Sequence, residues 1–295
     1  MGRGTVWKAA RGLMAQGLDV HAVRGRGYRL AEPLALLSPE AIRAGLGAEG
    51  REGLAELRVV ASVDSTNRAL LAEGARRGAG DHRAGAGGSA AGLRVLIAEH
   101  QSAGRGRRGR EWCSPLGLNL YLSCLWHVDR PPIFLSAFSL VAGLVVAEVL
   151  EAAGVTDPRV KWPNDVWWNG RKMVGILLEM AGEPAGPCDL VVGIGMNVNA
   201  VGPAAMDVDQ PWTSVREALG HPVDRNRLAA RLLGGLLAAR ERFEQDGLAS
   251  FQDGYRRRDL LQGRPVSVHL APGQRVEGTA LGVDDGGALR VRTST

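Results

Sequence analysis

The chain has 295 residues, of which 45% are hydrophobic and 23% are charged. This composition is typical of a globular protein and excludes a chain that is disordered throughout. A chain of this length forms one large domain or two and needs no disulfide bonds to stabilise its core. The formal net charge of +5 permits anionic partners but identifies none. Three cysteines at no metal-ligand spacing, and an N-terminus without the apolar region of a signal peptide, predict a cytoplasmic protein with no membrane segment.

The first segment of the chain has the pattern of part of a winged helix. A short helix is expected over residues 5–16. Residues 17–30 alternate apolar and polar side chains around the turn Arg24-Gly25-Arg26-Gly27, which predicts a basic two-stranded ribbon. We therefore expect a partial winged-helix unit over residues 1–32.

The middle of the chain, residues 33–262, is predicted to be one α+β domain. Helices are expected up to residue 77, over 134–153 and over 225–245, and strands over 57–63, 93–99, 118–126, 166–168, 173–180 and 190–198. Asn169-Gly170 between two apolar runs is a strong hairpin signal. Strands joined by hairpins, with helices between them, favour a mixed, largely antiparallel sheet over a doubly wound parallel one.

Two further segments differ in composition from this domain. Residues 78–92 are almost entirely Gly, Ala, Ser and Arg and are predicted to be a flexible surface insertion. Residues 263–295 carry short apolar runs with turn signals at Pro272-Gly273 and Asp285-Gly286-Gly287. They predict a small β-barrel at the C-terminal end.

The segment 104–110 holds the highest density of chemistry-bearing residues. Its sequence Gly-Arg-Gly-Arg-Arg-Gly-Arg combines glycines, which let backbone amides approach an anion, with arginine forks that bind carboxylate or phosphate. The four arginines repel one another unless an anionic ligand draws the loop down. The residues alone leave three interpretations open: a ligand-binding loop, a solvated basic loop, or an RNA-binding arginine–glycine segment.

Other polar groups lie at predicted strand ends. Pro163 restricts the backbone before it and holds Lys161 at a strand end, where the lysine either extends toward solvent or pairs with an anion. Ser65-Thr66-Asn67 lies between a strand and a helix, and a helix cap is its simplest explanation. Residues 193–197, Gly-Ile-Gly-Met-Asn, lack the third glycine of a dinucleotide-binding loop and match it weakly.

Taken together and in this order, the motifs resemble those of the biotin protein ligases. They are Ser65-Thr66-Asn67, Gln101 with Gly104-Arg105-Gly106-Arg107-Arg108-Gly109, Lys161-Trp162-Pro163-Asn164-Asp165, and residues 170–179. The resemblance covers nearly the whole chain. It implies a class II synthetase-like catalytic domain and an SH3-like C-terminal barrel. The N-terminal wing is similar to that of bifunctional members, which also repress biotin synthesis genes.

The resemblance implies a ligase that uses ATP to biotinylate a biotin carboxyl-carrier protein. The intermediate would be biotinyl-5′-adenylate, and the acceptor would be a lysine of the carrier. Biotin and ATP would be the substrates, Mg²⁺ would accompany ATP, and a homodimer is a family expectation. A lipoate or octanoate transferase is a rival that lacks the glycine–arginine loop. A DNA-binding regulator that only senses biotin is a second rival, against which intact Lys161 and Arg107 argue.

The same resemblance assigns roles to individual residues. Lys161 and Arg107 would be catalytic, and no protein ligand to a metal is expected. The residues implied in biotin binding are Ser65, Thr66, Asn67, Gln101, Arg105, Gly106, Arg107 and Lys161, and those implied in nucleotide binding are Trp112, Lys172 and Asn197. The first helix is similar to a recognition helix but has no earlier helix to pack on, so we expect weak or non-specific DNA binding.

Overall fold

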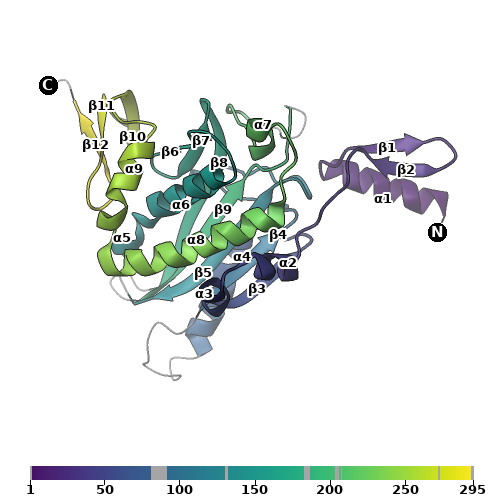
Figure 1. The fold of residues 1–295 in the computed structure, drawn as a ribbon, viewed down its shortest axis with the longest axis horizontal. Coiled ribbons are helices and arrows are strands. Elements are labelled where there is room, and N and C mark those ends of the chain that lie inside the picture. Colours follow the sequence, from purple (N-terminus) through teal and green to yellow (C-terminus); the bar gives the residue numbers. More distant parts are fainter. Residues whose placement is uncertain are drawn as a thin grey trace.

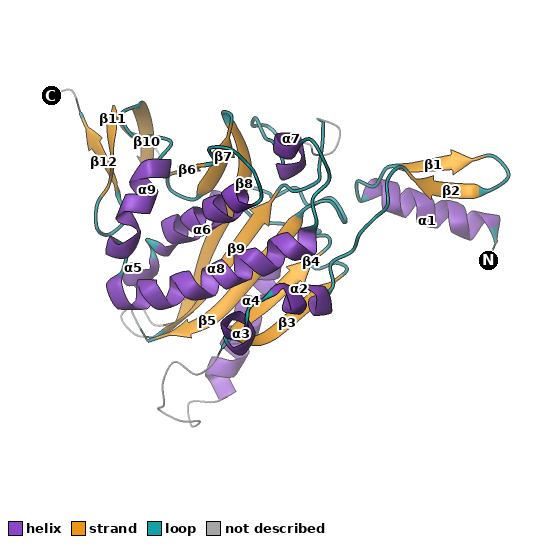
Figure 2. Ribbon diagram, viewed as in Figure 1, coloured by secondary structure: helices purple, strands orange, loops and turns teal. Residues whose placement is uncertain are grey.

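The computed structural model of the chain describes residues 2–80, 92–129, 132–182, 187–202, 206, 208–271 and 273–293. Within these residues the strands form three sheets, which follow one another along the chain (Figures 1 and 2). A two-stranded sheet lies near the N-terminus, a seven-stranded sheet forms the centre, and a three-stranded sheet lies near the C-terminus. The predicted α+β class is confirmed. Residues 81–91, which make up most of the predicted insertion, lie outside the described part.

The N-terminal unit is a helix packed on a hairpin. Helix α1 (Arg3–Ala15) is followed by strands β1 (Val20–Val23) and β2 (Gly27–Leu30), which pair antiparallel. This unit projects from the side of the central body in Figure 1. Its small apolar cluster includes Leu116 of the central body, and the Leu116 amide donates to the Gln16 carbonyl at 2.8 Å.

The central sheet has the order β3-β4-β5-β9-β8-β7-β6. The strands are β3 (Leu54–Val60), β4 (Leu93–Ala98), β5 (Leu120–Val128), β6 (Arg159–Lys161), β7 (Asp165–Trp168), β8 (Arg171–Gly182) and β9 (Cys188–Met196). Strands β3 and β4 are parallel and every other neighbouring pair is antiparallel. The Asn169-Gly170 turn joins β7 to β8 as predicted, and both residues have positive φ angles of 46° and 70°.

Helices cover both faces of this sheet. They are α2 (Pro39–Gly45), α3 (Ala48–Glu52), α4 (Thr66–Gly80), α5 (Pro132–Leu135), α6 (Phe138–Ala152), α7 (Val215–Leu219), α8 (Arg225–Asp246) and α9 (Gln252–Arg258). Helices α6 and α8 lie on one face and α4 lies behind the sheet in Figure 2. The helix expected over 134–153 is divided into α5 and α6. Four helices of five to seven residues (α2, α3, α7 and α9) were not expected, because such lengths show no periodicity.

The strand pleat assigns the two faces of the sheet to different tasks. On β9, Leu190, Val192, Ile194 and Met196 point into the main core under α6 and α8. Val191 points the other way and joins a small cluster with α4. One stretch of the described chain, Ile133–Ala152, is long and apolar enough to cross a membrane, but 72% of its most apolar window is buried inside the fold. Most of this stretch is α6, which packs in the core on one face of the sheet.

The C-terminal unit is a small antiparallel sheet. It contains β10 (Pro265–Ala271), β11 (Gln274–Val283) and β12 (Leu289–Arg292). It is joined to the central domain beside β6, where Trp162 Nε1 donates to the Gly287 carbonyl at 3.0 Å. The C-terminal sheet is thereby held next to the Lys161 segment.

A buried ion pair fixes the start of α8 against the sheet. Arg225 and Glu99 are 3% and 4% exposed, and Arg225 Nη1 lies 2.7 Å from Glu99 Oε2. Arg225 also donates to the Asn119 and Ala35 carbonyls, while the second Glu99 oxygen accepts from the Leu37 amide. These bonds join the start of α8 to the end of β4 and to the segment before α2.

Replacement of one member of this pair should therefore make the folded protein less stable. We expect Arg225→Met to lower the free energy of unfolding by about 3–5 kcal/mol, because Glu99 is left buried without its counter-charge. Urea denaturation measures this value. The matched control is Arg256→Met, which breaks an exposed pair with Asp253 and should cost less than about 1 kcal/mol. Equal losses in the two variants would contradict the assignment.

Candidate active site

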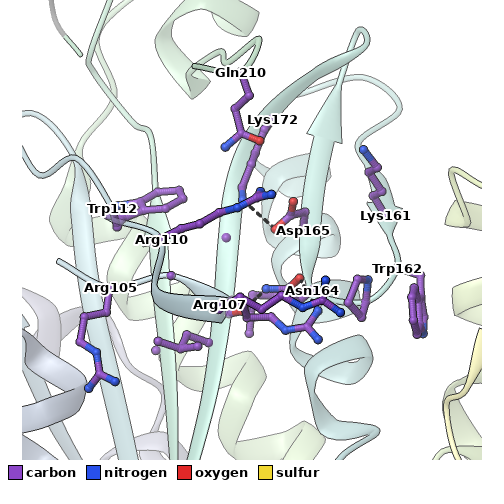
Figure 3. Close-up of a pocket in the computed structure, with 18 of the residues that line it drawn as sticks. Arg105, Arg107, Arg110, Trp112, Lys161, Trp162, Asn164, Asp165, Lys172 and Gln210 are labelled. Atoms are coloured by element: carbon purple, nitrogen blue, oxygen red, sulfur yellow. Dashed lines mark hydrogen bonds and ion pairs between the residues drawn. The ribbon is translucent and has the colours of Figure 1, made fainter. Parts of the chain in front are cut away.

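A cavity of about 720 Å³ lies on the α4 face of the central sheet, between the segment 105–112 and the C-terminal sheet (Figure 3). The structure places ten of the eleven expected site residues in its wall. They are Ser65, Thr66, Asn67, Gln101, Arg105, Gly106, Arg107, Trp112, Lys161 and Lys172. The remaining residue, Asn197, is buried outside the lining, where its Nδ2 donates to the Thr213 carbonyl at 3.1 Å. The cavity therefore unites motifs that lie up to 107 positions apart in the sequence.

The start of α4 supplies one polar end of the cavity. Gln101 Oε1 accepts from the Thr66 amide at 2.9 Å and from Thr66 Oγ1 at 3.1 Å. The other end of the same amide group, Gln101 Nε2, donates to Ser114 Oγ at 3.1 Å. Ser65 stands directly before the helix, as a capping residue does, and also lines the cavity. The cap and the site are thus the same residues.

Asn67 connects this helix to the middle strands. Its Nδ2 donates to the Leu177 carbonyl at 3.1 Å and to Glu179 Oε2 at 2.9 Å. Ser123 Oγ lies 2.6 Å from both Asn67 Oδ1 and Thr66 Oγ1. Since Asn67 is 3% exposed, these bonds fix the side chain before any ligand arrives.

Glycines on the strands make room for the groups above them. Gly175 and Gly195 are paired across β8 and β9, and a Cβ atom on them would lie 2.8 Å and 2.4 Å from ring atoms of Trp112. A Cβ on Gly193 would lie 2.1 Å from Asn67 Oδ1. Gly175 on β8 with Gly193 and Gly195 on β9 thus form a glycine floor beneath Trp112 and Asn67. Residues 193–196 belong to strand β9, so the weak match to a dinucleotide-binding loop has no structural counterpart.

The arginine-rich segment folds as a small hairpin. Arg105 and Glu111 form an antiparallel bridge, and the Trp112 amide donates to the Gly104 carbonyl at 2.9 Å. Residues 107–109 make the turn, in which Arg108 has a φ of 56°. This hairpin sends neighbouring arginines in different directions.

Each of three arginines consequently meets a different partner. Arg105 Nη2 lies 3.0 Å from Glu179 Oε1, and Arg107 Nη1 donates to Asn164 Oδ1 at 3.3 Å. Arg108 Nη2 donates to the His269 carbonyl on β10 at 3.0 Å. Burial and the nearby Arg108 lower the pKa of Arg107. The hairpin thus relieves part of the repulsion that the sequence predicts.

Two lysines approach the cavity from β6 and β8. Lys172 Nζ lies 2.9 Å from Asp165 Oδ1 and 5.4 Å from the centroid of the Trp112 ring. Burial lowers the pKa of Lys161, Asp165 partly restores it, and Lys172 lowers it further. In Figure 3, Lys161 points away from Arg107 and Asn164. Asp165 is thus the carboxylate that acts on both ammonium groups, as an ion-pair partner of Lys172 and as a nearby charge for Lys161.

The residue roles inferred from the sequence omitted several members of this site. Asn164 and Asp165 belong to a motif that was noted, but their partners Arg107 and Lys172 could not be known from spacing. The alternation of Gly193 and Gly195 was a usable signal for a strand with one bare face. Gln210 lines the cavity from a loop and carries no signal in the sequence.

Fold and site together define an α+β domain that gathers six cationic side chains around one cavity. Residues 89–197 match the Biotin/lipoate A/B protein ligase family, and residues 262–295 match the Biotin protein ligase C terminal domain. The chain is 39% identical over 289 residues to the Bifunctional ligase/repressor BirA of Escherichia coli, covering 98% of this chain and 84% of that protein.

Two further comparisons agree. The Biotin--[acetyl-CoA-carboxylase] ligase of Mycobacterium tuberculosis is 39% identical over 241 residues, which are 80% of this chain and 83% of that protein. A biotin protein ligase from Aquifex aeolicus in complex with biotin and ATP is similar in structure, with a TM-score of 0.61, 27% identity, and coverage of 81% of this chain and 90% of that one. The chain belongs to the biotin protein ligases and is a ligase enzyme.

The contact between Trp112 and the glycine floor can be tested by stability. Gly195→Ala places a Cβ against the Trp112 ring and should lower the free energy of unfolding by about 1–3 kcal/mol. Urea denaturation of a double-mutant cycle measures the coupling. In a Trp112→Ala background the same glycine change should cost much less, and an equal cost in both backgrounds would show that the ring is not the obstacle.

Proposed function

We propose that this chain uses ATP to biotinylate a biotin carboxyl-carrier protein, through biotinyl-5′-adenylate and transfer to an acceptor lysine. The observation that carries the proposal is the convergence of Lys161, Lys172 and Arg107 on the cavity that the Ser65–Asn67 segment and Trp112 also line. The similar Aquifex aeolicus structure contains biotin and ATP, and the similar Mycobacterium tuberculosis protein is named for the acetyl-CoA-carboxylase that it modifies.

The first step joins two anions. A carboxylate oxygen of biotin attacks the α-phosphate of ATP, a phosphorus–oxygen bond forms, and pyrophosphate leaves. Cations must offset the repulsion between the reactants and the charge that develops on the phosphate oxygens. In our proposal Lys161 contacts both the carboxylate and the α-phosphate, and it acts by its charge rather than as a nucleophile.

The second step transfers the biotinyl group. The amine of the acceptor lysine attacks the anhydride carbonyl, an amide bond forms, and AMP leaves with the shared oxygen. Water would destroy the same anhydride, so the segment Arg105–Arg107 closes over it in our proposal. Flexible glycines beside charged arginines suit a segment that orders around an anion.

The two ends of the cavity suit the two substrates. Hydroxyl and amide groups of Ser65, Thr66, Asn67 and Gln101 offer both donors and acceptors, as the ureido ring of biotin requires. The Trp112 ring and Lys172 suit an adenine ring and a phosphate, respectively. Asn197 supports this end from outside the lining, where its amide donates to the Met173 carbonyl next to Lys172.

Mg²⁺ accompanies ATP in this proposal. Among the described residues no group of three or more His, Cys, Asp or Glu side chains is placed to hold a metal ion, and the carboxylates in the cavity wall are Glu111 and Asp165. This donor set fits an ion that is held mainly by phosphate oxygens and water, with at most one or two carboxylates. The ion would neutralise the leaving pyrophosphate.

The remaining expectations from the sequence stay predictions. These are the division of the chain at residues 32 and 262, a homodimer, a place in the cytoplasm, and weak DNA contact. For the last, Arg24, Arg26 and Arg29 are exposed on the β1–β2 hairpin, where they suit phosphate contacts that position DNA without reading its sequence.

Mass spectrometry of a carrier domain incubated with the protein, biotin and MgATP tests the proposed function. We expect the carrier to gain the mass of one biotinyl group, and no gain when its acceptor lysine is replaced. Incubation with lipoate or octanoate in place of biotin tests the rival transferase. Acylation by those acids without biotinylation would overturn the proposal.

Lys161 is expected to be essential for the first step. Lys161→Ala should keep the fold and lower the rate of adenylate formation by about 10²–10³, because a cation at a developing negative charge contributes about 3–4 kcal/mol. Lys161→Arg should also fail, since a planar fork does not replace a compact ammonium. The rate of biotin-dependent pyrophosphate exchange measures this, with Lys8→Ala on α1 as the control. A rate within threefold of the wild type would exclude the role.

Arg107 is expected to retain the adenylate. Arg107→Gly removes charge-assisted hydrogen bonds worth roughly 1.5–3 kcal/mol each and leaves a more flexible loop. Adenylate formation should survive in part through Lys161, but the released anhydride should acylate lysines of a bystander such as albumin. A blot for bystander biotinylation and a direct measurement of the adenylate off-rate check this, with Arg26→Gly on the wing as the control. An unchanged off-rate without bystander labelling would show that Arg107 is only a solvated charge.

A further inference from the structure

Lys161 meets an aromatic ring where its neighbour Lys172 meets a carboxylate. Its Nζ lies 3.8 Å from the centroid of the Trp167 ring. Of the ion pairs within the described part of the chain, none includes Lys161, whereas Lys172 Nζ lies 2.9 Å from Asp165 Oδ1. The two ammonium groups of the cavity are therefore held by different forces.

The sheet register accounts for this contact. Strands β6 and β7 pair antiparallel with Lys161 opposite Asp165. Trp167 lies two positions further along β7, so its side chain leaves the same face as that of Asp165, while Val166 between them is fully buried on the other side. Diagonal neighbours on one face of a sheet are within reach of long and aromatic side chains. The ring thus lies beside the ammonium by virtue of the strand pairing.

We propose that Trp167 is a positioning residue for Lys161: the indole face of Trp167 holds the ammonium at the edge of the cavity, where no carboxylate of the described residues forms an ion pair with it. This inference rests on the proposed function, in which Lys161 contacts two anions. If Lys161 were paired with a carboxylate, an anionic substrate would have to displace that carboxylate before it could contact the lysine. A ring face stabilises the charged amine and leaves its other side open to the substrate.

The environment of the tryptophan itself supports a role for the ring face. Trp167 Nε1 is buried and has no hydrogen-bond partner in the described structure, so packing rather than a hydrogen bond holds the ring. A phenyl ring can therefore replace it. The next residue, Trp168, points to the opposite face, packs against the main core and donates from Nε1 to the Thr156 carbonyl at 2.8 Å. It provides a matched control of the same residue type.

Burial and two neighbouring charges shift the pKa of Lys161. Burial lowers this pKa and is the largest cause, Asp165 from β7 raises it, and Lys172 from β8 lowers it. Arg107 shares the cavity. Asp259, which follows α9 and pairs with Val160, accepts from the Leu261 amide at 2.8 Å. Leucine keeps position 167 apolar but has no ring face that favours the charged amine. Trp167→Leu should therefore lower the pKa of Lys161 further, which opposes protonation where the substrate needs it.

The sequence makes this measurement simple, because Lys8, Lys161 and Lys172 are the lysines of the chain. Competitive labelling with acetic anhydride over a range of pH, followed by peptide mass spectrometry, gives the pKa of Lys161 against exposed Lys8. We expect Trp167→Leu to lower it by about 0.5–1.5 pH units. In the same variant kcat for biotin-dependent pyrophosphate exchange should fall about 5- to 30-fold, with a smaller change in KM.

Conservative and control variants decide between positioning and general packing. Trp167→Phe keeps a ring face and should retain both the pKa of Lys161 and most of kcat, whereas Trp168→Leu should leave that pKa unchanged. Trp167→Met replaces Trp167→Leu if circular dichroism shows that the leucine variant is unfolded. An unchanged pKa of Lys161 in the folded aliphatic variant overturns the inference. If Lys161→Ala still abolishes exchange in that case, the proposed function stands. If the wild type shows no biotin-dependent exchange, the proposed function itself fails.

Discussion

Electrostatic repulsion within one cavity is the constraint on which the arrangement of this site depends. Six cationic side chains line the cavity, from the arginine hairpin and the two lysines, together with two carboxylates. Like charges that line one cavity repel one another and oppose folding unless each of them has a partner or contacts solvent. The hairpin solves part of the problem because it turns Arg105 toward Glu179 and Arg108 toward the C-terminal sheet. The charge that is left over is what a polyanionic substrate would meet.

The central sheet makes this possible because its two faces are chemically separate. Alternate residues of β9 pack into a continuous apolar core under α6 and α8, and that core bears the stability of the domain. The opposite face carries glycines where a side chain would collide with Asn67 or Trp112. Bare strand positions of this kind give up local packing, and the apolar core under α6 and α8 compensates elsewhere. The cavity face can be polar and partly hollow because the opposite face is apolar and closely packed, and so supplies the stability.

The sequence predicted the features that depend on local chemistry or on ordered motifs. Asn169-Gly170 specified its hairpin because two successive positive φ angles are cheap only for such residues. The mixed sheet followed from hairpin-linked strands, and ten expected residues lie in one cavity wall. The short helices α2, α3, α7 and α9 were missed because one or two turns leave no period to detect. The partners of Arg105, Arg107 and Lys172 were missed because they depend on strand register and on a hairpin, which no spacing along the chain reveals.

The different partners of the two lysines show how one sheet gives the same residue type two roles. Lys172 is neutralised by Asp165 and lies near Trp112, so it presents a partly satisfied charge beside an aromatic surface. Lys161 lies two strands further along the sheet, on β6, and faces Trp167, which stabilises its charge without cancelling it. Apart from Lys8, the chain has lysine only at these two cavity positions, and in our proposal the compact ammonium of Lys161 suits an approach to an anion from one side. An arginine at position 161 would spread its charge over a plane and would cover the ring, so that little of it faced the cavity. A lysine at position 161 and an aromatic ring at position 167 therefore depend on each other, because the pairing of β6 with β7 places them side by side.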